Sequence, residues 1–128
     1  QEGIVRTGKL TEHRKLDDFA AFVKSAFHLK QVRVYGDPDD TVVTCAVLPG
    51  SGKDEIDLAI AAGADVMVTG DVNHHAGLDA VEKGIDLIDA GHYGVEKLFV
   101  PYMEDYLHRN LPSLETIAAP EGEPCRLI

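Results

Sequence analysis

The sequence has no tryptophan, only two cysteines, and no apolar run as long as the ~18 residues that can cross a bilayer. No signal-peptide pattern is visible at its start. We therefore expect a cytoplasmic protein with no membrane partner. Cys45 falls in a predicted buried strand and Cys125 in a polar tail. Reduced thiols are the expected state, and a disulfide is the less favoured alternative.

Basic residues are also scarce, with 12 lysines and arginines against 22 acidic residues and a formal charge of −10. A negative surface repels nucleic-acid phosphates, so no nucleic-acid partner is expected. With 128 residues, 45% of them hydrophobic, the chain can bury one core. We predict a single α/β domain over residues 1–120 and a tail over 121–128. A start at Gln1 rather than at a methionine is expected of a processed protein or of a piece of a longer one.

The N-terminal part of the chain predicts two strands around a helix. Residues 3–10 are bracketed by glycines and predict a short strand. Apolar residues then recur with the spacing of an amphipathic helix. They are Leu16, Phe19, Ala20, Val23, Ala26 and Phe27. Residues 31–35 alternate polar and apolar side chains, as an edge strand does, and residues 36–40 predict a turn.

From Thr41 onward the pattern alternates between strand and helix. Apolar runs predict strands that pair in parallel, and glycines close the helices between them. The predicted strands are 42–48, 65–69 and 85–89, and the predicted helices are 54–62 and 76–82. A turn around Val95, a helix over 99–110 and a last strand over 114–118 complete the prediction. The expected fold class is α/β, with a mainly parallel sheet and helices on both faces.

His92 and Glu96 follow the last of these strands and are the candidate metal ligands. Their i, i+4 spacing places an imidazole and a carboxylate on one side of a helical turn. That pair of donors suits zinc, iron, manganese or nickel. The alternative is a helix-capping histidine beside a solvated glutamate. Two ligands alone do not form a stable site, because three or four are usual.

Polar residues also follow the other two strands. Asp71, His74 and His75 are candidate substrate-binding residues, because ligands of open parallel sheets bind beyond the carboxyl ends of the strands. The alternative is a helix start capped by Asn73, with both histidines in solvent. The segment 50–52 (Gly-Ser-Gly) suits either an anion site or a tight turn, and the tight turn is favoured.

Four segments give the sequence a resemblance to a known family, the NIF-three-like proteins (GTP cyclohydrolase I type 2 homologues). They are GIVRTGKL at 3–10, PGSG at 49–52, TGDVNHH at 69–75 and AGHYGVE at 90–96. The resemblance implies one lobe of a two-lobed α/β subunit, assembled into a toroidal hexamer with a dinuclear metal site between the lobes. It carries over His92 and Glu96 as metal ligands. The other ligands, a histidine pair and an aspartate, belong to an N-terminal lobe that is not found here, so the chain resembles the C-terminal lobe.

The same resemblance implies a function for the intact protein. It would bind two divalent metal ions per subunit and act as a metal-dependent hydrolase of the GTP cyclohydrolase I type 2 kind, on a nucleotide-like substrate. It would also be a homo-oligomer. A non-catalytic metal-binding scaffold or regulatory protein is the alternative, because it would need the same ligands. A phosphate-binding domain using residues 50–52 is a third.

Overall fold

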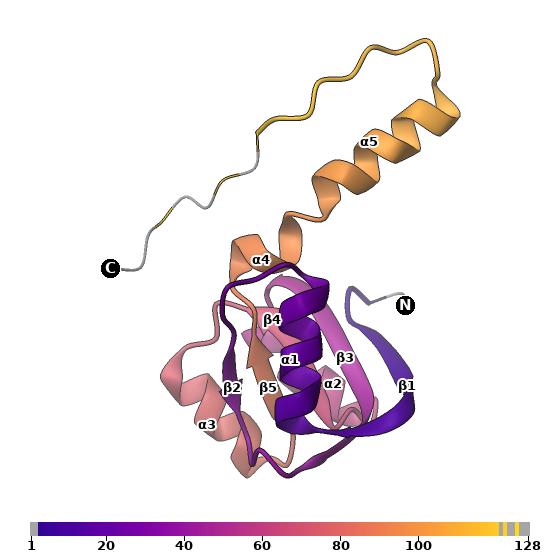
Figure 1. Cartoon of the computed structure of the whole chain (residues 1–128). Coiled ribbons are helices and arrows are strands. Elements are labelled where there is room, and N and C mark those ends of the chain that lie inside the picture. Colours follow the sequence, from indigo (N-terminus) through magenta and orange to yellow (C-terminus); the bar gives the residue numbers. More distant parts are fainter. Residues whose placement is uncertain (1–2, 121, 123–124, 126–128) are drawn as a thin grey trace.

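The computed structural model describes residues 3–120, 122 and 125. Its centre is one five-stranded sheet with the strand order β1-β3-β4-β5-β2. The strands are β1 (Arg6–Lys15), β2 (Arg33–Tyr35), β3 (Thr41–Ser51), β4 (Val66–Gly70) and β5 (Asp86–Asp89). The helices are α1 (Leu16–Ala26), the 3-10 turn η1 (Lys53–Glu55), α2 (Ile56–Ala61), α3 (His74–Glu82), α4 (His92–Glu96) and α5 (Phe99–Asn110). Figure 1 shows the sheet with helices on both faces, and α5 leading away from it.

The three central strands pair in parallel, as the alternation of strands and helices predicts. In the register of β3 with β4, Cys45 lies opposite Val66, and in that of β4 with β5, Val66 lies opposite Asp86. Both edges of the sheet are antiparallel, with β1 beside β3 and β2 beside β5. The sheet is therefore mixed, and its parallel centre brings the carboxyl ends of β3, β4 and β5 to one edge.

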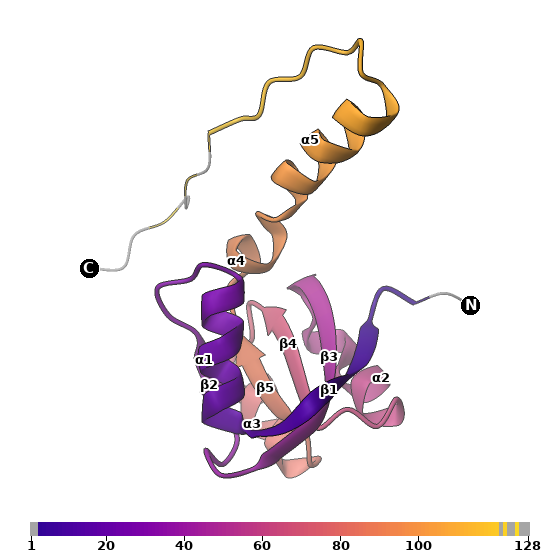
Figure 2. The same cartoon turned by 45° about the vertical axis from the view of Figure 1, so that its right-hand side comes forward.

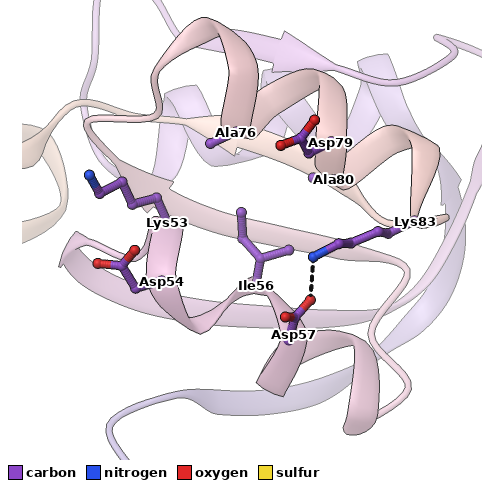
Figure 3. Close-up of a pocket in the computed structure, with 8 residues that line it drawn as sticks. All are labelled: Lys53, Asp54, Ile56, Asp57, Ala76, Asp79, Ala80 and Lys83. Atoms are coloured by element: carbon purple, nitrogen blue, oxygen red, sulfur yellow. Dashed lines mark hydrogen bonds and ion pairs between the residues drawn. The ribbon is translucent and has the colours of Figure 1, made fainter.

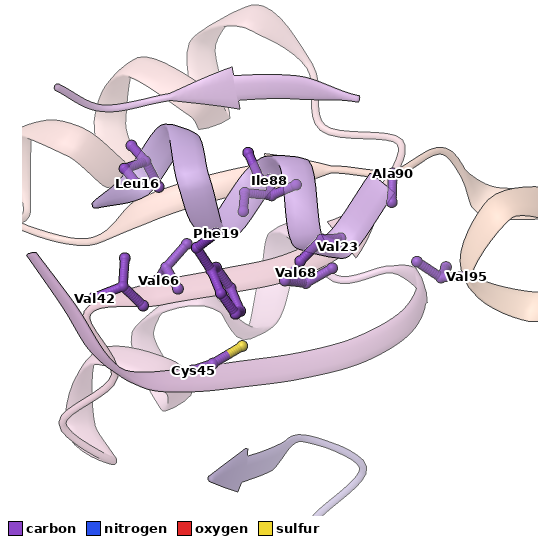
Figure 4. Packing of buried hydrophobic residues seen from close by; sticks show 11 residues of the cluster. Leu16, Phe19, Val23, Val42, Cys45, Val66, Val68, Ile88, Ala90 and Val95 are labelled. Atoms are coloured by element: carbon purple, nitrogen blue, oxygen red, sulfur yellow. The ribbon is translucent and has the colours of Figure 1, made fainter. Parts of the chain in front are cut away.

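Alternating side chains of the central strands supply two separate cores. Val66 and Val68 pack with α1 on one face, and Met67 between them packs with α2 and α3 on the other. Figure 4 shows the α1 side, where Phe19 lies between the helix and the strands. Strands buried on both faces explain why the central apolar runs of the sequence are continuous rather than alternating.

Several element boundaries differ from the prediction, and two of the differences have a clear origin. β1 continues from the predicted end at residue 10 to Lys15, with a register shift against β3 between Lys9 and Arg14. Its polar, exposed residues carry no hydrophobic pattern that could reveal this extension. Helix α3 begins at His74, two residues early, because the Asn73 side chain accepts a hydrogen bond from the Ala76 amide at 2.9 Å.

The predicted strand over 114–118 is wrong. The segment has no regular structure, and Ile117 is 90% exposed. It follows α5, which carries the chain away from the sheet, so no strand edge is within its reach (Figure 1). Most of the predicted tail over 121–128 lies outside the described residues. Among the described residues, no helix has the length and apolar character needed to span a membrane.

Candidate metal-binding site

The candidate site lies where β3, β4 and β5 end. Figure 2 shows the arrowheads of these strands pointing toward α4, the short helix that carries His92 and Glu96. The chain turns from β5 into α4 at Gly91, whose φ of 73° is favoured by glycine. Helix α4 contacts both β3 and β4. The sequence predicted a turn around Val95. The structure has a short helix there, which packs against the edge of the sheet.

His92 lies between two carboxylates that contact its two ring nitrogens. Its Nδ1 is 2.8 Å from Oδ2 of Asp71, and its Nε2 is 3.2 Å from Oε1 of Glu96. The three side chains remain 48%, 57% and 51% exposed in the order His92, Asp71, Glu96. The hydrogen bond to Asp71, and then the charge of Glu96, raise the pKa of His92 above its ordinary value. The structure therefore brings together three of the five predicted site residues.

The carboxyl end of β3 packs beside this group. The Gly52 amide donates a hydrogen bond to Thr69 Oγ1 at 2.9 Å, and the Thr69 hydroxyl donates to the Gly50 carbonyl at 3.2 Å. Gly50 has a φ of 74°, and a β-carbon there would lie 2.9 Å from Glu96 Oε1 and 3.6 Å from His92 Nε2. Gly50 and Ser51 thus end β3 and Gly52 alone links it to η1, so the predicted turn is shorter than residues 50–52. Gly50 leaves space beside the candidate ligands.

Asp89 joins the loop that follows β4 to the loop that follows β5. Its carboxylate accepts hydrogen bonds from the Val72 amide at 3.2 Å and from the Gly91 amide at 3.0 Å. Arg33 of β2 lies 3.7 Å away and balances its charge. The sequence analysis did not single out this residue. A carboxylate at the end of an apolar strand, two residues before a glycine turn, is the signal that could have found it.

His74 and His75 lie at the start of α3 and are both exposed. Their rings contact each other edge to face, with 5.6 Å between the centroids. Within the described part of the chain, neither hydrogen-bonds to His92 or Asp71. A role of these histidines in substrate binding stays a prediction.

Two donor atoms of the site suit a metal ion. Bonds of about 2.1 Å from one ion can reach both atoms of a pair separated by up to about 4.2 Å, and His92 Nε2 and Glu96 Oε1 are 3.2 Å apart. The absence of a side chain at Gly50 keeps this side of the pair clear. Residues 3–120 contain no group of three or more His, Cys, Asp or Glu side chains placed to hold an ion. The donors present thus fit part of a coordination sphere.

A separate pocket of about 110 Å³ lies between α2 and α3 (Figure 3). An ion pair between Lys83 Nζ and Asp57 Oδ1, at 2.7 Å, crosses it. None of the candidate site residues lines it. Binding pockets for drug-sized molecules have about 300 to 1,000 Å³, so this one is too small for a nucleotide.

The fold and the paired donors define an α/β lobe with two candidate metal ligands at its strand ends. The family model described as Duf34/NIF3 (NGG1p interacting factor 3) matches residues 1–124. The chain belongs to this family.

Relatives and solved structures agree with this assignment. The chain is 40% identical over 114 residues to the GTP cyclohydrolase 1 type 2 homolog of Bacillus subtilis, covering 89% of the chain and 29% of that protein. It is 44% identical over 91 residues to the protein of the same name from Staphylococcus aureus, covering 71% of this chain and 25% of that protein. The crystal structure of Staphylococcus aureus protein SA1388 superposes with a TM-score of 0.85 at 29% identity, covering 98% of this chain and 42% of that one. The crystal structure of a Bacillus cereus protein related to NIF3 superposes with a TM-score of 0.83 at 31% sequence identity, covering 98% of this chain and 36% of that one. The chain thus spans about 29% of the Bacillus subtilis relative's length.

Proposed function

We propose that this chain is the C-terminal lobe of a protein that binds two divalent metal ions per subunit, with His92 and Glu96 as ligands. The observation that carries the proposal is the 3.2 Å contact between His92 Nε2 and Glu96 Oε1 at the sheet edge. Parallel α/β sheets bind their ligands at this edge. Nitrogen and carboxylate donors suit zinc, iron, manganese or nickel.

The remaining ligands would come from outside this lobe. Two protein donors are fewer than the three or four of a stable site. The curated relatives are longer than this chain and therefore have further residues that can supply donors. The site would thus lie between this lobe and another part of the intact subunit.

We further propose that the intact protein is a hydrolase acting on a nucleotide-like substrate. The support is the name of the curated relatives, GTP cyclohydrolase 1 type 2 homolog. Bound divalent ions lower the pKa of a water molecule and so supply hydroxide near neutral pH. In this chain, His92 and Glu96 would hold the ions, and His74 or His75 would contact the substrate or transfer a proton.

The open position of the candidate site bears on how it would work. His92 and Glu96 are each about half exposed, whereas ligand sites bury most of a bound molecule. A substrate would therefore be enclosed only when another lobe or another subunit covers this edge. We accordingly propose that the active form is a cytoplasmic homo-oligomer.

Elemental analysis after dialysis tests metal binding, with the full-length protein beside its His92→Ala and Glu96→Ala variants. Each variant should retain less metal than the wild type, and an exposed-site control, Asp18→Ala, should retain the same amount. Unchanged metal in both site variants would refute the ligand assignment. Turnover of GTP and related nucleotides is measured on the same metal-loaded samples. Metal binding without turnover of any nucleotide would favour the non-catalytic scaffold.

A further inference from the structure

The neutral imidazole of His92 can satisfy only one of its two carboxylate neighbours. A neutral ring carries one N–H, on either Nδ1 or Nε2, and the other nitrogen presents a lone pair. Asp71 lies at Nδ1 and Glu96 at Nε2. Whichever carboxylate accepts the ring hydrogen therefore decides which nitrogen remains as a donor to a ligand. A metal ion beside Glu96 needs the lone pair on Nε2.

The distances favour Asp71 as the acceptor. The contact from His92 Nδ1 to Asp71 Oδ2 is a hydrogen bond of 2.8 Å, within the range of charge-assisted bonds. The contact from Nε2 to Glu96 Oε1 is an ion-pair distance of 3.2 Å, at the long end of the hydrogen-bond range. A ring hydrogen on Nδ1 therefore gains the shorter bond.

The backbone on both sides of Asp71 is held in place. Asp71 has a φ of 56°, in the left-handed region that aspartate tolerates better than most residues. On one side of it, Gly70 packs so closely that a β-carbon would lie 2.6 Å from the His92 backbone nitrogen. On the other side, the Val72 amide is bonded to the Asp89 carboxylate. Both neighbours of Asp71 are thus held against the segment from Asp89 to His92.

The side chain of Glu96 has more conformational freedom than that of Asp71. It lies in the last turn of a five-residue helix, its side chain is about half exposed, and its only polar contact among the described residues is His92. Glutamate also has one more rotatable bond than aspartate and loses more side-chain entropy when it is fixed. In the competition for the ring hydrogen, Asp71 is therefore the preorganised acceptor.

We propose that Asp71 is a positioning residue that keeps the ring hydrogen of His92 on Nδ1 and so leaves the Nε2 lone pair free beside Glu96. This role differs from the substrate contact expected from the sequence, and its importance for metal binding rests on the proposed function. Carboxylates that orient a metal-binding histidine in this way hold both its tautomer and its ring plane. The tautomer itself is a property of the metal-free chain and can be measured there.

The test is long-range ¹H–¹⁵N NMR of the His92 ring in the metal-free 128-residue chain, at a pH where the ring is neutral. The informative variants are Asp71→Gly and Asp71→Asn, because both residues accept the left-handed backbone that alanine would strain. Glycine removes the carboxylate, and the asparagine amide can either accept from or donate to Nδ1. Glu96→Gln changes the competing carboxylate, and Asp18→Asn is a control for the loss of one exposed charge.

In the wild type, Glu96→Gln and Asp18→Asn, we expect the Nδ1–H tautomer to dominate. In Asp71→Gly we expect that dominance to be lost, while the amide spectrum of the remaining chain stays that of the folded protein. In Asp71→Asn we expect it to be weakened, because the amide can accept the ring hydrogen but carries no charge. An Asp71→Gly variant that folds and keeps the wild-type tautomer would overturn the proposal. A wild-type ring with its hydrogen on Nε2 would overturn it without any variant.

Metal analysis of the full-length variants separates this inference from the proposed function. Loss of the Nδ1–H tautomer in Asp71→Gly, with unchanged metal content in full-length His92→Ala, would support Asp71 as the positioning residue and count against His92 as a ligand. Reduced metal content in full-length His92→Ala, with no change of tautomer in Asp71→Gly, would support the ligand and overturn the positioning role.

Discussion

Gly50 and Glu96 lie so close together that a side chain at position 50 would displace the end of the Glu96 side chain. A β-carbon there would lie 2.9 Å from Oε1 of Glu96. Gly50 lies near the end of the long strand β3, and Glu96 ends α4, so the contact joins two elements that are far apart in the sequence. The glycine is thus needed twice, for its φ of 74° and for the clearance it gives the candidate ligand.

Gly50→Ala and Gly63→Ala form a matched pair that separates these two requirements. Gly63 has a φ of 73°, but a β-carbon there would meet no atom of the described residues within 4 Å. Each substitution should lower the free energy of unfolding by about 1 to 2 kcal/mol, because alanine is strained in the left-handed region. Urea denaturation measures this loss.

Only Gly50→Ala should also displace the flexible end of Glu96 and shift the NMR signals of the His92 ring. Equal effects of both variants on that ring would show that the clearance at Gly50 is not needed. A ring signal unchanged in Gly50→Ala would show the same.

Asp89 should act as a local clamp between the loops that follow β4 and β5. Asp89→Ala removes the acceptor for the Val72 and Gly91 amides. We expect a loss of about 1 to 3 kcal/mol in unfolding free energy, because two amides lose a charged partner whose side chain is only 10% exposed. Amide hydrogen exchange should become faster at Val72 and Gly91.

Asp65→Ala is the matched control for this clamp. The Asp65 carboxylate accepts hydrogen bonds from the Val43 and Thr44 amides, at 2.9 and 2.7 Å, near the start of β3. Its loss should speed exchange at those two amides and leave Val72 and Gly91 protected. Faster exchange at all four amides in both variants would indicate global destabilisation rather than two local clamps.

The sequence predicted the parallel centre of the sheet and the two candidate ligands, but not the bonds that hold the site together. His92 and Glu96 could be found because their i, i+4 spacing follows a strand end directly. The contact between Asp71 and His92 joins residues 21 positions apart. Parallel strands predict that such ends are near, but not which atoms meet. Thr69 and Asp89 were missed because a polar residue at a strand end has the same local pattern whether it faces solvent or a backbone amide.

Asp86 should make the stability of the protein depend on pH. It is 8% exposed, and burial, together with the charges of Asp40, Asp65 and Asp37, raises the pKa of its carboxyl to about 6. A carboxyl with a raised folded-state pKa stabilises the fold fully below its unfolded value of 3.8. This contribution is lost as the pH rises through about 6.

Asp86→Asn removes this ionisation and tests the effect. At pH 7 the variant should be more stable than the wild type by about 3 kcal/mol at most, because a rise of the pKa from 3.8 to about 6 corresponds to that free energy, and the difference should vanish below pH 3.8. Urea denaturation of both proteins across this range gives the difference, since titrations of groups distant from Asp86 cancel. A difference that is constant with pH would contradict the raised pKa.

Helix α5 should mediate self-association. It buries none of its residues, and Phe99, Tyr102 and Tyr106 form an exposed aromatic stripe at i, i+3 and i+7. Figure 1 shows it extending away from the sheet, where a second chain or another lobe could cover it. Exposed apolar patches of this kind often mark protein interfaces.

We therefore expect light scattering to give a mass above that of the 13.9 kDa monomer at high concentration. Tyr102→Glu should lower this mass by placing a charge in the stripe, whereas Ile117→Glu, at a more exposed apolar residue outside the helix, should not. A wild-type chain that stays monomeric, or equal effects of the two variants, would show that the α5 stripe is not the interface.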